Sequence, residues 1–253
     1  MKNRSADPIM FSLDKGKQSM TGKLAVVSTP IGNLEDITFR AVRTLKEVSV
    51  IAAEDTRRTQ KLCAHYHITT PLTSYHDFNK EEKTPVLINR MIEGADVALV
   101  SDAGTPLISD PGYYLITHAV AVGIPIVPVP GPSAILAALT ISALPPDSFI
   151  FLGFLPRKRG ARAQLLARLA DDPRTLIVFE SPHRLLNTLE LVRETLGSRR
   201  ITIARELTKL HEEVVRGTVD EMIEAFRSRA PKGEITLVIE GNKPKRPSKI
   251  SDP

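Results

Sequence analysis

Residues 97–112 read Val-Ala-Leu-Val-Ser-Asp-Ala-Gly-Thr-Pro-Leu-Ile-Ser-Asp-Pro-Gly. The run 97–101 is continuous and mostly apolar, which is typical of a parallel strand buried on both faces. The turn after it contains Gly104, where the absence of a Cβ lets a ligand approach the backbone closely. Asp102 and Asp110 lie in two successive turns, which is more than a connection needs, although a helix cap would also explain an aspartate there. The stretch predicts an open α/β sheet with a site at its carboxyl edge.

The same arrangement of a strand followed by a turn rich in Gly, Pro, Asp or Ser recurs along the chain. The four further examples begin at residues 24–29, 49–53, 126–129 and 176–179. Ligands of open α/β sheets bind at the carboxyl ends of strands, where loops meet helix N-termini. Turn chemistry repeated at these ends predicts an enzyme or a small-ligand protein.

The order of the expected elements predicts an α/β protein of two lobes, each a mainly parallel sheet flanked by helices. Strands and helices alternate over residues 23–144, and Pro145-Pro146 interrupts the series. A second alternating series fills residues 145–242. Residues 1–22 are expected to be a flexible N-terminal extension and residues 243–253 a disordered basic tail, because neither has the apolar periodicity of a core.

Composition excludes several classes of protein. The chain is 42% hydrophobic and 25% charged, so it is globular and has enough apolar residues for a core. It has neither a signal peptide nor a run of about 18 apolar residues, and we expect a cytoplasmic protein with no membrane contact. The single cysteine, Cys63, excludes an internal disulfide and a cysteine-based zinc site. A net charge of +5 is compatible with a nucleic-acid partner but does not prove one.

Several common site motifs are absent from the sequence. Pro30-Ile31-Gly32 has one glycine after the first strand, which argues against a dinucleotide site of the Gly-x-Gly-x-x-Gly type. No Walker A, His-Glu-x-x-His or Gly-x-Ser-x-Gly sequence occurs. The histidines are scattered, and no metal is expected.

Charged and capping residues supply further candidates, each with an alternative. Pro130-Gly131-Pro132-Ser133 opens a helix whose free N–H groups favour an anion, or Ser133 only caps that helix. The segment 157–162 carries four positive charges in six residues and predicts either a phosphate-binding loop over the cleft between the lobes or a solvated charge run. The RNA-contact candidates are Arg157, Lys158, Arg159 and Arg162, extended by Arg57 and Arg58 at the end of the second strand.

Two further charged residues lie at strand ends in the second half of the chain. Glu180 ends a buried strand, and a carboxylate at this position is either a helix cap or a site residue. Lys209 lies in a dense polar run, which is either the rim of the site or a solvated loop.

Taken in order, these motifs resemble the tetrapyrrole (corrin/porphyrin) methylase family over about residues 23–241, and most closely the branch that modifies ribosomal RNA. The strings that carry the resemblance are Thr29-Pro30-Ile31-Gly32-Asn33-Leu34, Glu54-Asp55-Thr56-Arg57, Ser101-Asp102-Ala103-Gly104-Thr105-Pro106-Leu107-Ile108-Ser109-Asp110-Pro111-Gly112, Pro130-Gly131-Pro132-Ser133-Ala134, Phe179-Glu180-Ser181-Pro182-His183-Arg184 and Arg205-Glu206-Leu207-Thr208-Lys209. Many tetrapyrrole methylases have a glycine-rich run after the first strand, and its absence here favours the RNA branch.

The resemblance implies a homodimer that binds S-adenosylmethionine between its lobes. It implies methylation of the 2′-oxygen of a cytidine in the decoding region of 16S rRNA, free or in the small ribosomal subunit. The alternatives are methylation of a tetrapyrrole or another small molecule, and an RNA-binding scaffold without catalysis. The residues implied to contact the cofactor are Pro30, Gly32, Gly104, Thr105, Pro106, Ile108, Ser133 and Ala134 in the first lobe, and Leu207 and Thr236 in the second.

A ribose hydroxyl is a weak acid, so a base or a nearby cation should help its attack on the methyl group. The candidates are Lys209 and Glu180, with Asp102 as an orienting residue. Positioning of the acceptor supplies much of the acceleration in such a reaction.

Overall fold

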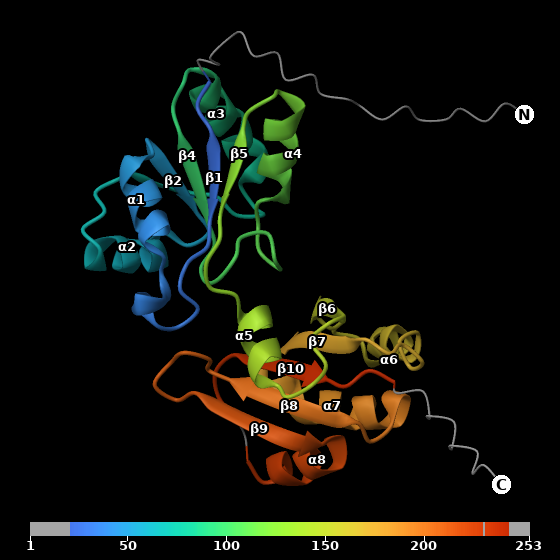
Figure 1. The fold of residues 1–253 in the computed structure, drawn as a ribbon. Helices are drawn as coiled ribbons and strands as arrows, with labels where there is room; N and C mark the ends of the chain where they lie inside the picture. The colour runs from blue at the N-terminus through green and yellow to red at the C-terminus, as the bar shows by residue number, and fades with distance from the viewer. Residues whose placement is uncertain (1–20, 230, 243–253) are drawn as a thin grey trace, which may run out of the picture.

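The structure is a computed structural model, and it describes residues 21–229 and 231–242. The expected tail 243–253 and nearly all of the expected extension 1–22 lie outside these residues. Gly22, at the start of the described part, donates its backbone N–H to the carbonyl of Met91. The described chain forms two sheets that lie one above the other in Figure 1, as the two-lobed prediction required.

The first sheet has five strands in the order β3-β2-β4-β1-β5, and every pair is parallel. The strands are β1 (Leu24–Val27), β2 (Val50–Ala53), β3 (Leu72–Ser74), β4 (Val97–Val100) and β5 (Ile126–Val129). β2 and β4 are buried along their whole length, which explains their continuous apolar sequence. β3 was not expected, because a three-residue edge strand with one apolar residue has no sequence periodicity to detect.

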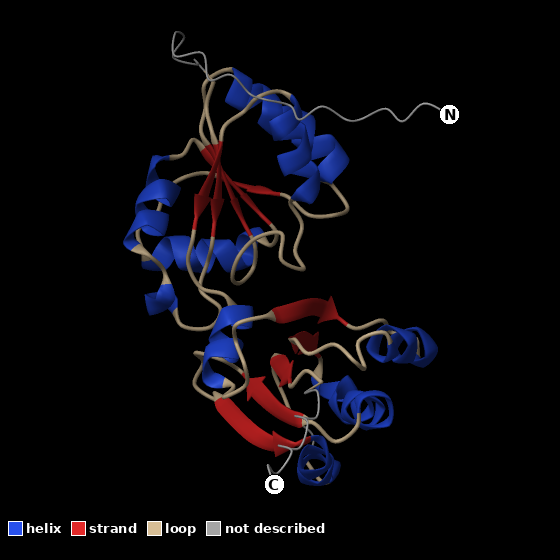
Figure 2. Ribbon diagram, turned by 45° about the vertical axis from the view of Figure 1, so that its right-hand side comes forward, coloured by secondary structure: helices blue, strands red, loops and turns tan. Residues whose placement is uncertain are grey.

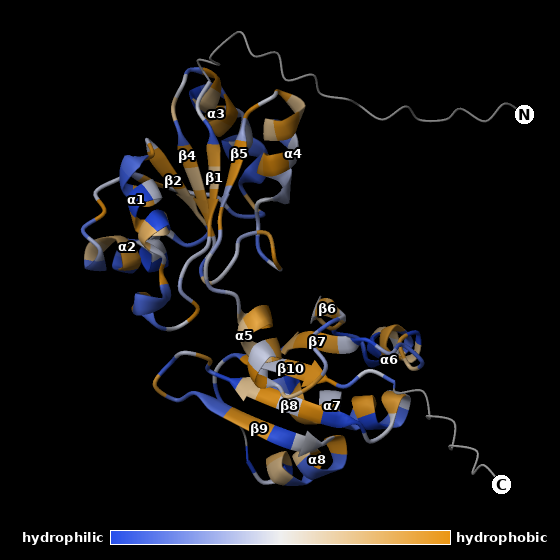
Figure 3. Ribbon diagram, in the orientation of Figure 1, coloured by the Kyte–Doolittle hydropathy of each residue, from blue (hydrophilic) through white to orange (hydrophobic). Residues whose placement is uncertain are grey.

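Helices cover both faces of this sheet (Figure 2). On one face, α1 (Phe39–Glu47) and α2 (Thr56–His65) pack against alternate strand residues, and on the other face α3 (Lys80–Ile92) and α4 (Tyr113–Ala121) pack against the intervening ones. The apolar residues therefore gather in the middle of the lobe (Figure 3). The consequence for function is that the carboxyl ends of all five strands meet at the edge that faces the second lobe.

The second sheet has the order β6-β7-β10-β8-β9. Its strands are β6 (Phe149–Phe154), β7 (Thr175–Glu180), β8 (Arg200–Arg205), β9 (Glu213–Thr218) and β10 (Ile235–Ile239). Only β6 and β7 pair in parallel; the other three pairs are antiparallel. The expectation of a mainly parallel second sheet is therefore wrong. The seven residues between β8 and β9 are too few for the crossover that a parallel pair needs, so these strands form a hairpin.

Three helices cover one face of the second sheet: α6 (Arg159–Ala167), α7 (Leu185–Leu196) and α8 (Val219–Arg227). The opposite face is covered by α5 (Ala134–Ile141), whose buried Ala138 and Leu139 pack with Ile177 and Val238 (Figure 1). The predicted boundary at residue 144 assigned α5 to the first lobe. Its packing favours a junction at residues 130–133 instead, because the buried face of α5 lies on the second sheet.

Among the described residues, no helix is long and apolar enough to cross a membrane. Short 3-10 helices occur at Leu34–Asp36 and Pro182–Arg184.

Candidate functional site

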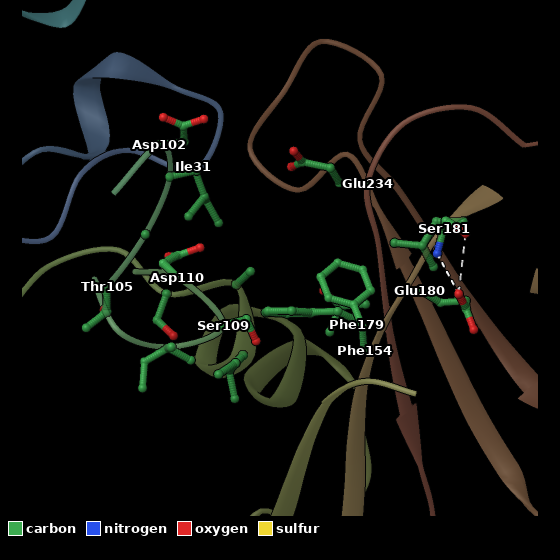
Figure 4. Close-up of a pocket in the computed structure, with 18 of the residues that line it drawn as sticks. Ile31, Asp102, Thr105, Ser109, Asp110, Phe154, Phe179, Glu180, Ser181 and Glu234 are labelled. Carbon is green, nitrogen blue, oxygen red and sulfur yellow. Dashed lines mark hydrogen bonds between the residues drawn. The ribbon is translucent and has the colours of Figure 1, made fainter. Parts of the chain in front are cut away.

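A cavity of about 410 Å³ lies between the carboxyl edge of the first sheet and the second lobe. This size falls within the usual range for small-molecule sites. Figure 4 shows residues of the first lobe, such as Ile31, Thr105 and Asp110, on one side of it and residues of the second, such as Phe179 and Glu234, on the other. The lining residues of the first lobe follow β1, β2, β4 and β5. Those of the second lobe come from the ends of β6 and β7, the start of β10, and the loops after β7 and before β10.

The loop 101–112 forms much of the first-lobe wall. Gly104 has φ +82°, and its backbone forms an isolated bridge with Thr29. Leu107 and Ser109 also have positive φ, of 73° and 71°. Such conformations are costly for residues with a Cβ and tend to occur at functional sites. Thr105 fixes the loop from inside, because its hydroxyl lies 3.1 Å from Ser28 Oγ and donates to the Pro132 carbonyl.

Three carboxylates lie together on this wall: Glu54, Asp102 and Asp110. Burial, followed by the charge of Glu54, raises the pKa of Asp110 to about 6. Burial also raises the pKa of Glu54. Arg58 Nη1 lies 3.3 Å from Asp102 Oδ2 and partly balances the negative charge. The wall therefore favours a cationic ligand group.

The opposite wall combines two aromatic side chains with polar ones such as Glu234. The rings of Phe154 and Phe179 lie 5.7 Å apart between centroids, and both line the cavity. β6 has an irregularity between Phe151 and Phe154, and Gly153 there has φ +61°. A Cβ at Gly153 would lie 3.3 Å from Ser109 Oγ, so this irregularity brings the two lobes into close approach.

A second contact between the lobes joins the loop after β1 to the loop after β8. The Asn33 backbone N–H donates to Thr208 Oγ1 at 3.1 Å. A Cβ on Gly32 would lie 2.4 Å from Lys209 Cγ, so only glycine fits there without a shift. Glu206 and Thr208 have φ of 51° and 65°, so this loop is strained on the side that meets Gly32.

The structure brings together most of the residues predicted to contact a cofactor. Gly104, Thr105, Ile108, Ser133, Ala134 and Thr236 line the cavity. Leu207 lines a small adjoining hollow of about 30 Å³ that shares Ala134 and Thr236. Pro30, Gly32 and Pro106 are not among the lining residues, and they shape the loops that hold Ile31 and Thr105.

The three catalytic candidates have different surroundings. Asp102 lines the cavity and accepts the Asp55 backbone N–H at 3.0 Å. Lys209 Nζ lies 2.8 Å from Glu206 Oε1 and 3.0 Å from Glu234 Oε2. Partial burial lowers the pKa of Lys209, but the bonds to these two carboxylates outweigh it and raise the pKa overall. Lys209 is therefore a cation at neutral pH, which argues against its role as a base.

Glu180 lies in the cavity wall, but its carboxylate points away from the first lobe (Figure 4). Its Oε2 accepts the Thr188 hydroxyl at 2.5 Å, and its Oε1 accepts the Ser181 backbone N–H at 2.8 Å. Arg184 Nε adds an ion pair at 3.3 Å. With a fully buried side chain and both oxygens occupied, Glu180 is suited to hold the segment after β7 and poorly suited to remove a proton from a substrate.

The basic candidates do not form one surface. Arg157 and Lys158 are exposed before α6, and Arg159 pairs with Glu194 at 2.6 Å. Arg162 is only 6% exposed and donates to Thr188 Oγ1. The expectation that Arg162 contacts RNA is therefore corrected, because its side chain points from α6 into the lobe. Arg58 lines the cavity, and Arg57 is exposed but bonded to Asp55.

Sequence reasoning missed several cavity residues as site residues. Glu54 and Asp110 lie in strings that carry the family resemblance, and their position directly after a buried strand or within a polar turn was the available signal. Phe179 also lies in one of these strings, whereas Phe154 gave no such signal, because an aromatic residue in a strand usually indicates core packing. In the described part of the chain, no cluster of three or more His, Cys, Asp or Glu side chains is arranged to hold a metal ion.

The sequence profile of the Tetrapyrrole (Corrin/Porphyrin) Methylases matches residues 23–223. The chain belongs to this family. Within it, the chain is 53% identical over 221 residues to a protein of Halalkalibacterium halodurans named ribosomal RNA small subunit methyltransferase I, covering 87% of this chain and 76% of that one. A protein of the same name from Thermotoga maritima is 50% identical over 220 residues, covering 87% and 99%.

Solved structures of tetrapyrrole methylases share the fold. Uroporphyrin-III-C-methyltransferase from Thermus thermophilus aligns with a TM-score of 0.59 and 22% identity, over 86% of this chain and 94% of that one. The methyltransferase CobJ aligns with a TM-score of 0.65 and 18% identity, over 90% and 97%. A further structure of the T. thermophilus enzyme, with a TM-score of 0.60, 20% identity and coverage of 86% and 97%, is described as complexed with S-adenyl homocysteine. The predictions of a methyltransferase and of a two-lobed α/β fold are confirmed by the family.

Proposed function

We propose that this protein transfers a methyl group from S-adenosylmethionine to the 2′-oxygen of a cytidine in 16S ribosomal RNA. The observation that carries the proposal is identity of about half over most of the chain to proteins named ribosomal RNA small subunit methyltransferase I. The cofactor follows from the methyltransferase family. The 2′-oxygen and the cytidine come from the sequence resemblance and are the finer part of the proposal.

The residues around the cavity fit this cofactor. S-adenosylmethionine carries a sulfonium and an ammonium, and Asp102, Asp110 and Glu54 provide negative charge on one wall. Phe154 and Phe179 provide an apolar surface for an adenine ring. Gly104, without a Cβ, lets the backbone of loop 101–112 approach the ligand. When bound, the cofactor supplies a methyl group that is already activated by its positive sulfur.

The protein's own residues then have to bind the acceptor ribose, orient it and assist loss of its proton. Lys209 is suited to lower the pKa of a nearby hydroxyl as a fixed cation, because Glu206 and Glu234 keep it protonated. Asp102 is suited to orient a cation or a hydroxyl, since Asp55 N–H and Arg58 hold its carboxylate in place.

The alternative is methylation of a tetrapyrrole, which the solved structures of the same fold perform according to their names. Structures with such names share only 20–22% identity with this chain, so they support the fold and do not decide the substrate. The higher identity to the rRNA methyltransferases favours RNA. We propose further that the protein works as a homodimer in the cytoplasm and contacts RNA phosphates through Arg57, Arg58, Arg157, Lys158 and Arg159.

Methyl transfer from an isotope-labelled donor tests the proposal. Purified protein is incubated with trideuteromethyl S-adenosylmethionine and small ribosomal subunits from cells that lack this protein, and in parallel with uroporphyrinogen III. The rRNA is digested to nucleosides for mass spectrometry. We expect labelled 2′-O-methylcytidine and no labelled tetrapyrrole. Label on a base, or only on the tetrapyrrole, would contradict the proposal.

A further inference from the structure

Phe78 is the most exposed large apolar residue in the described part of the chain, with 99% of its surface open to solvent. It lies in the turn 75–79, between β3 and α3. An exposed phenylalanine gains nothing from burial in the fold, so its side chain does not contribute to the core of either lobe. Its role is therefore inferred from its position in the fold.

Strand register places this turn beside the cavity. β3 pairs in parallel with β2, with Ala53 opposite Ser74, and the Tyr75 N–H donates to the Ala53 carbonyl at 2.7 Å. The residues after Ser74 therefore leave the sheet next to those after Ala53. The first of these is Glu54, which lines the cavity. Phe78 follows four residues after Ser74, so it lies at the same carboxyl edge of the first sheet as the cavity, outside the residues that line it.

Hydrogen bonds hold the turn in one conformation. The His76 backbone N–H donates to Asn79 Oδ1 at 2.8 Å, and Asn79 Nδ2 donates to the Ser74 carbonyl at 3.2 Å. The Asn79 N–H closes the turn on the His76 carbonyl. Below it, the Tyr75 hydroxyl is buried against Thr84 Oγ1 at 3.0 Å. A turn fixed in this way presents the Phe78 ring without a large entropy cost on binding.

The same edge of the sheet carries basic side chains. Arg57 and Arg58 lie in the first turn of α2, after Glu54 and the N-cap Asp55, and their side chains are 88% and 63% exposed. Next to Phe78, Asp77 is paired with Lys80 at 3.0 Å. The ring of His76 lies 6.1 Å from that of Phe78, edge toward face. An aromatic ring beside guanidinium groups is the combination that binds single-stranded nucleic acid, with bases on the ring and phosphates on the cations.

We propose that Phe78 stacks on a nucleobase next to the methylated nucleotide of the RNA substrate. This inference rests on the proposed function, and it assigns to this edge of the sheet a subsite for an RNA base. A cytidine that enters the cavity must leave its own stack, so its neighbours lose a stacking partner. Phe78 replaces that partner. Because every base has a π-face, the subsite tolerates any base at that position.

The test compares RNA affinity of Phe78→Ala, Phe78→Leu and Phe78→Trp with that of the wild type. The probes are a labelled single-stranded RNA of mixed sequence and small ribosomal subunits from cells without this protein. We expect Phe78→Ala to bind between about fivefold and about a hundredfold more weakly, the range for loss of one base–aromatic stack. The RNA affinity of Phe78→Leu should fall by a similar factor, and Phe78→Trp should retain wild-type affinity.

Two further readouts separate stacking from other roles. The slope of affinity against salt should be unchanged in Phe78→Ala, because a stack releases no counterions. S-adenosylmethionine affinity, measured by calorimetry, should also be unchanged. Phe39→Ala is the matched control, since Phe39 is 98% exposed but borders a different hollow, with Val42 and Tyr66. It should leave RNA affinity unaltered.

Unchanged RNA affinity in Phe78→Ala, with a wild type that binds and methylates RNA, would overturn the stacking subsite alone. A wild type that neither binds nor methylates either RNA would overturn the proposed function with it. If Phe78→Ala halves the solution mass of the protein and Phe39→Ala does not, the ring belongs to a contact between copies and the RNA subsite is wrong.

Discussion

Gly32 and Lys209 lie in different lobes, and no side chain fits between them: a Cβ at position 32 would lie 2.4 Å from Cγ of Lys209 and 2.8 Å from the Leu207 carbonyl oxygen. This contact lies next to Leu207, which lines the small hollow that adjoins the cavity. Lys209 is also bonded to both Glu206 and Glu234. The relative position of the two lobes and the position of the Lys209 charge are thus coupled.

Gly32→Ala should weaken this contact between the two lobes. Because the nearest atoms include backbone, the loops must separate or strain, and we expect the free energy of unfolding to fall by about 1–3 kcal/mol. Cofactor affinity should fall as well. Gly160→Ala is the control, since nothing lies within 4 Å of a Cβ there and α6 favours alanine. Denaturant titration and calorimetry of both variants measure this; equal behaviour of the two would contradict the role given to Gly32.

Asp110 should make stability depend on pH. Its pKa is raised to about 6 in the folded protein, from an ordinary 3.8, so the folded state binds the proton more tightly than the unfolded state. Its stabilising contribution is complete below the ordinary value and is lost as pH rises through about 6. Asp110→Asn should therefore gain stability relative to wild type between pH 4 and pH 7, by roughly 1 kcal/mol because solvent screens the group.

Denaturant unfolding of both proteins at several pH values between about 4 and about 8 checks this. The Glu54 carboxyl is retained in both proteins, but its charge contributes to the raised pKa of Asp110, so the difference in stability includes the interaction between the two carboxyls. A stability difference that stays constant over this range would show that Asp110 does not titrate as its surroundings require.

Lys209→Ala should reduce turnover strongly at saturating cofactor. If Lys209 stabilises the developing negative charge on the ribose oxygen, we expect a loss of about a hundredfold or more. Lys209→Arg should recover part of it, because the charge is kept. Single-turnover methylation of small subunits measures the step. Near-normal turnover in Lys209→Ala would remove it from the mechanism.

Arg157 and Lys158 should contribute to RNA affinity by neutralising phosphates. Replacing both with glutamine should lower the salt slope of RNA binding by about 0.7 for each phosphate of a single strand that is no longer neutralised. Arg159→Gln should have less effect, because Arg159 already pairs with Glu194. A salt slope identical to that of the wild type would exclude the segment before α6 from the RNA interface.

Much of the fold could be predicted from the sequence. The runs 97–101 and 126–129 end in turns that are typical of the carboxyl edge of an α/β sheet, and β4 and β5 end at that edge. The direction of β10 could not be predicted, because an apolar strand pattern has the same period in parallel and antiparallel pairs. For β8 and β9, the short connection between them was an available signal for a hairpin. The packing of α5 on the second sheet could not be predicted either, because its apolar residues would fit against either lobe.

The site was predicted best where backbone conformation decides it. Gly104, Thr105 and Ser133 lie in turns whose residue types require a particular conformation, and they line the cavity. Arg162 and Glu180 are less accessible to a ligand than expected, because burial and bonding to Thr188 depend on packing that no local pattern records. Phe154 reaches the cavity through an irregularity in β6 that the sequence does not mark clearly.

A crystal structure with S-adenosylhomocysteine tests the central claim most directly. We expect density for the whole molecule in the cavity between the lobes, in contact with Ile31, Gly104, Ala134 and Thr236, and with its amino group toward Asp102 or Asp110. Density that instead occupies the hollow beside α1, with the cavity between the lobes filled only by water, would contradict it.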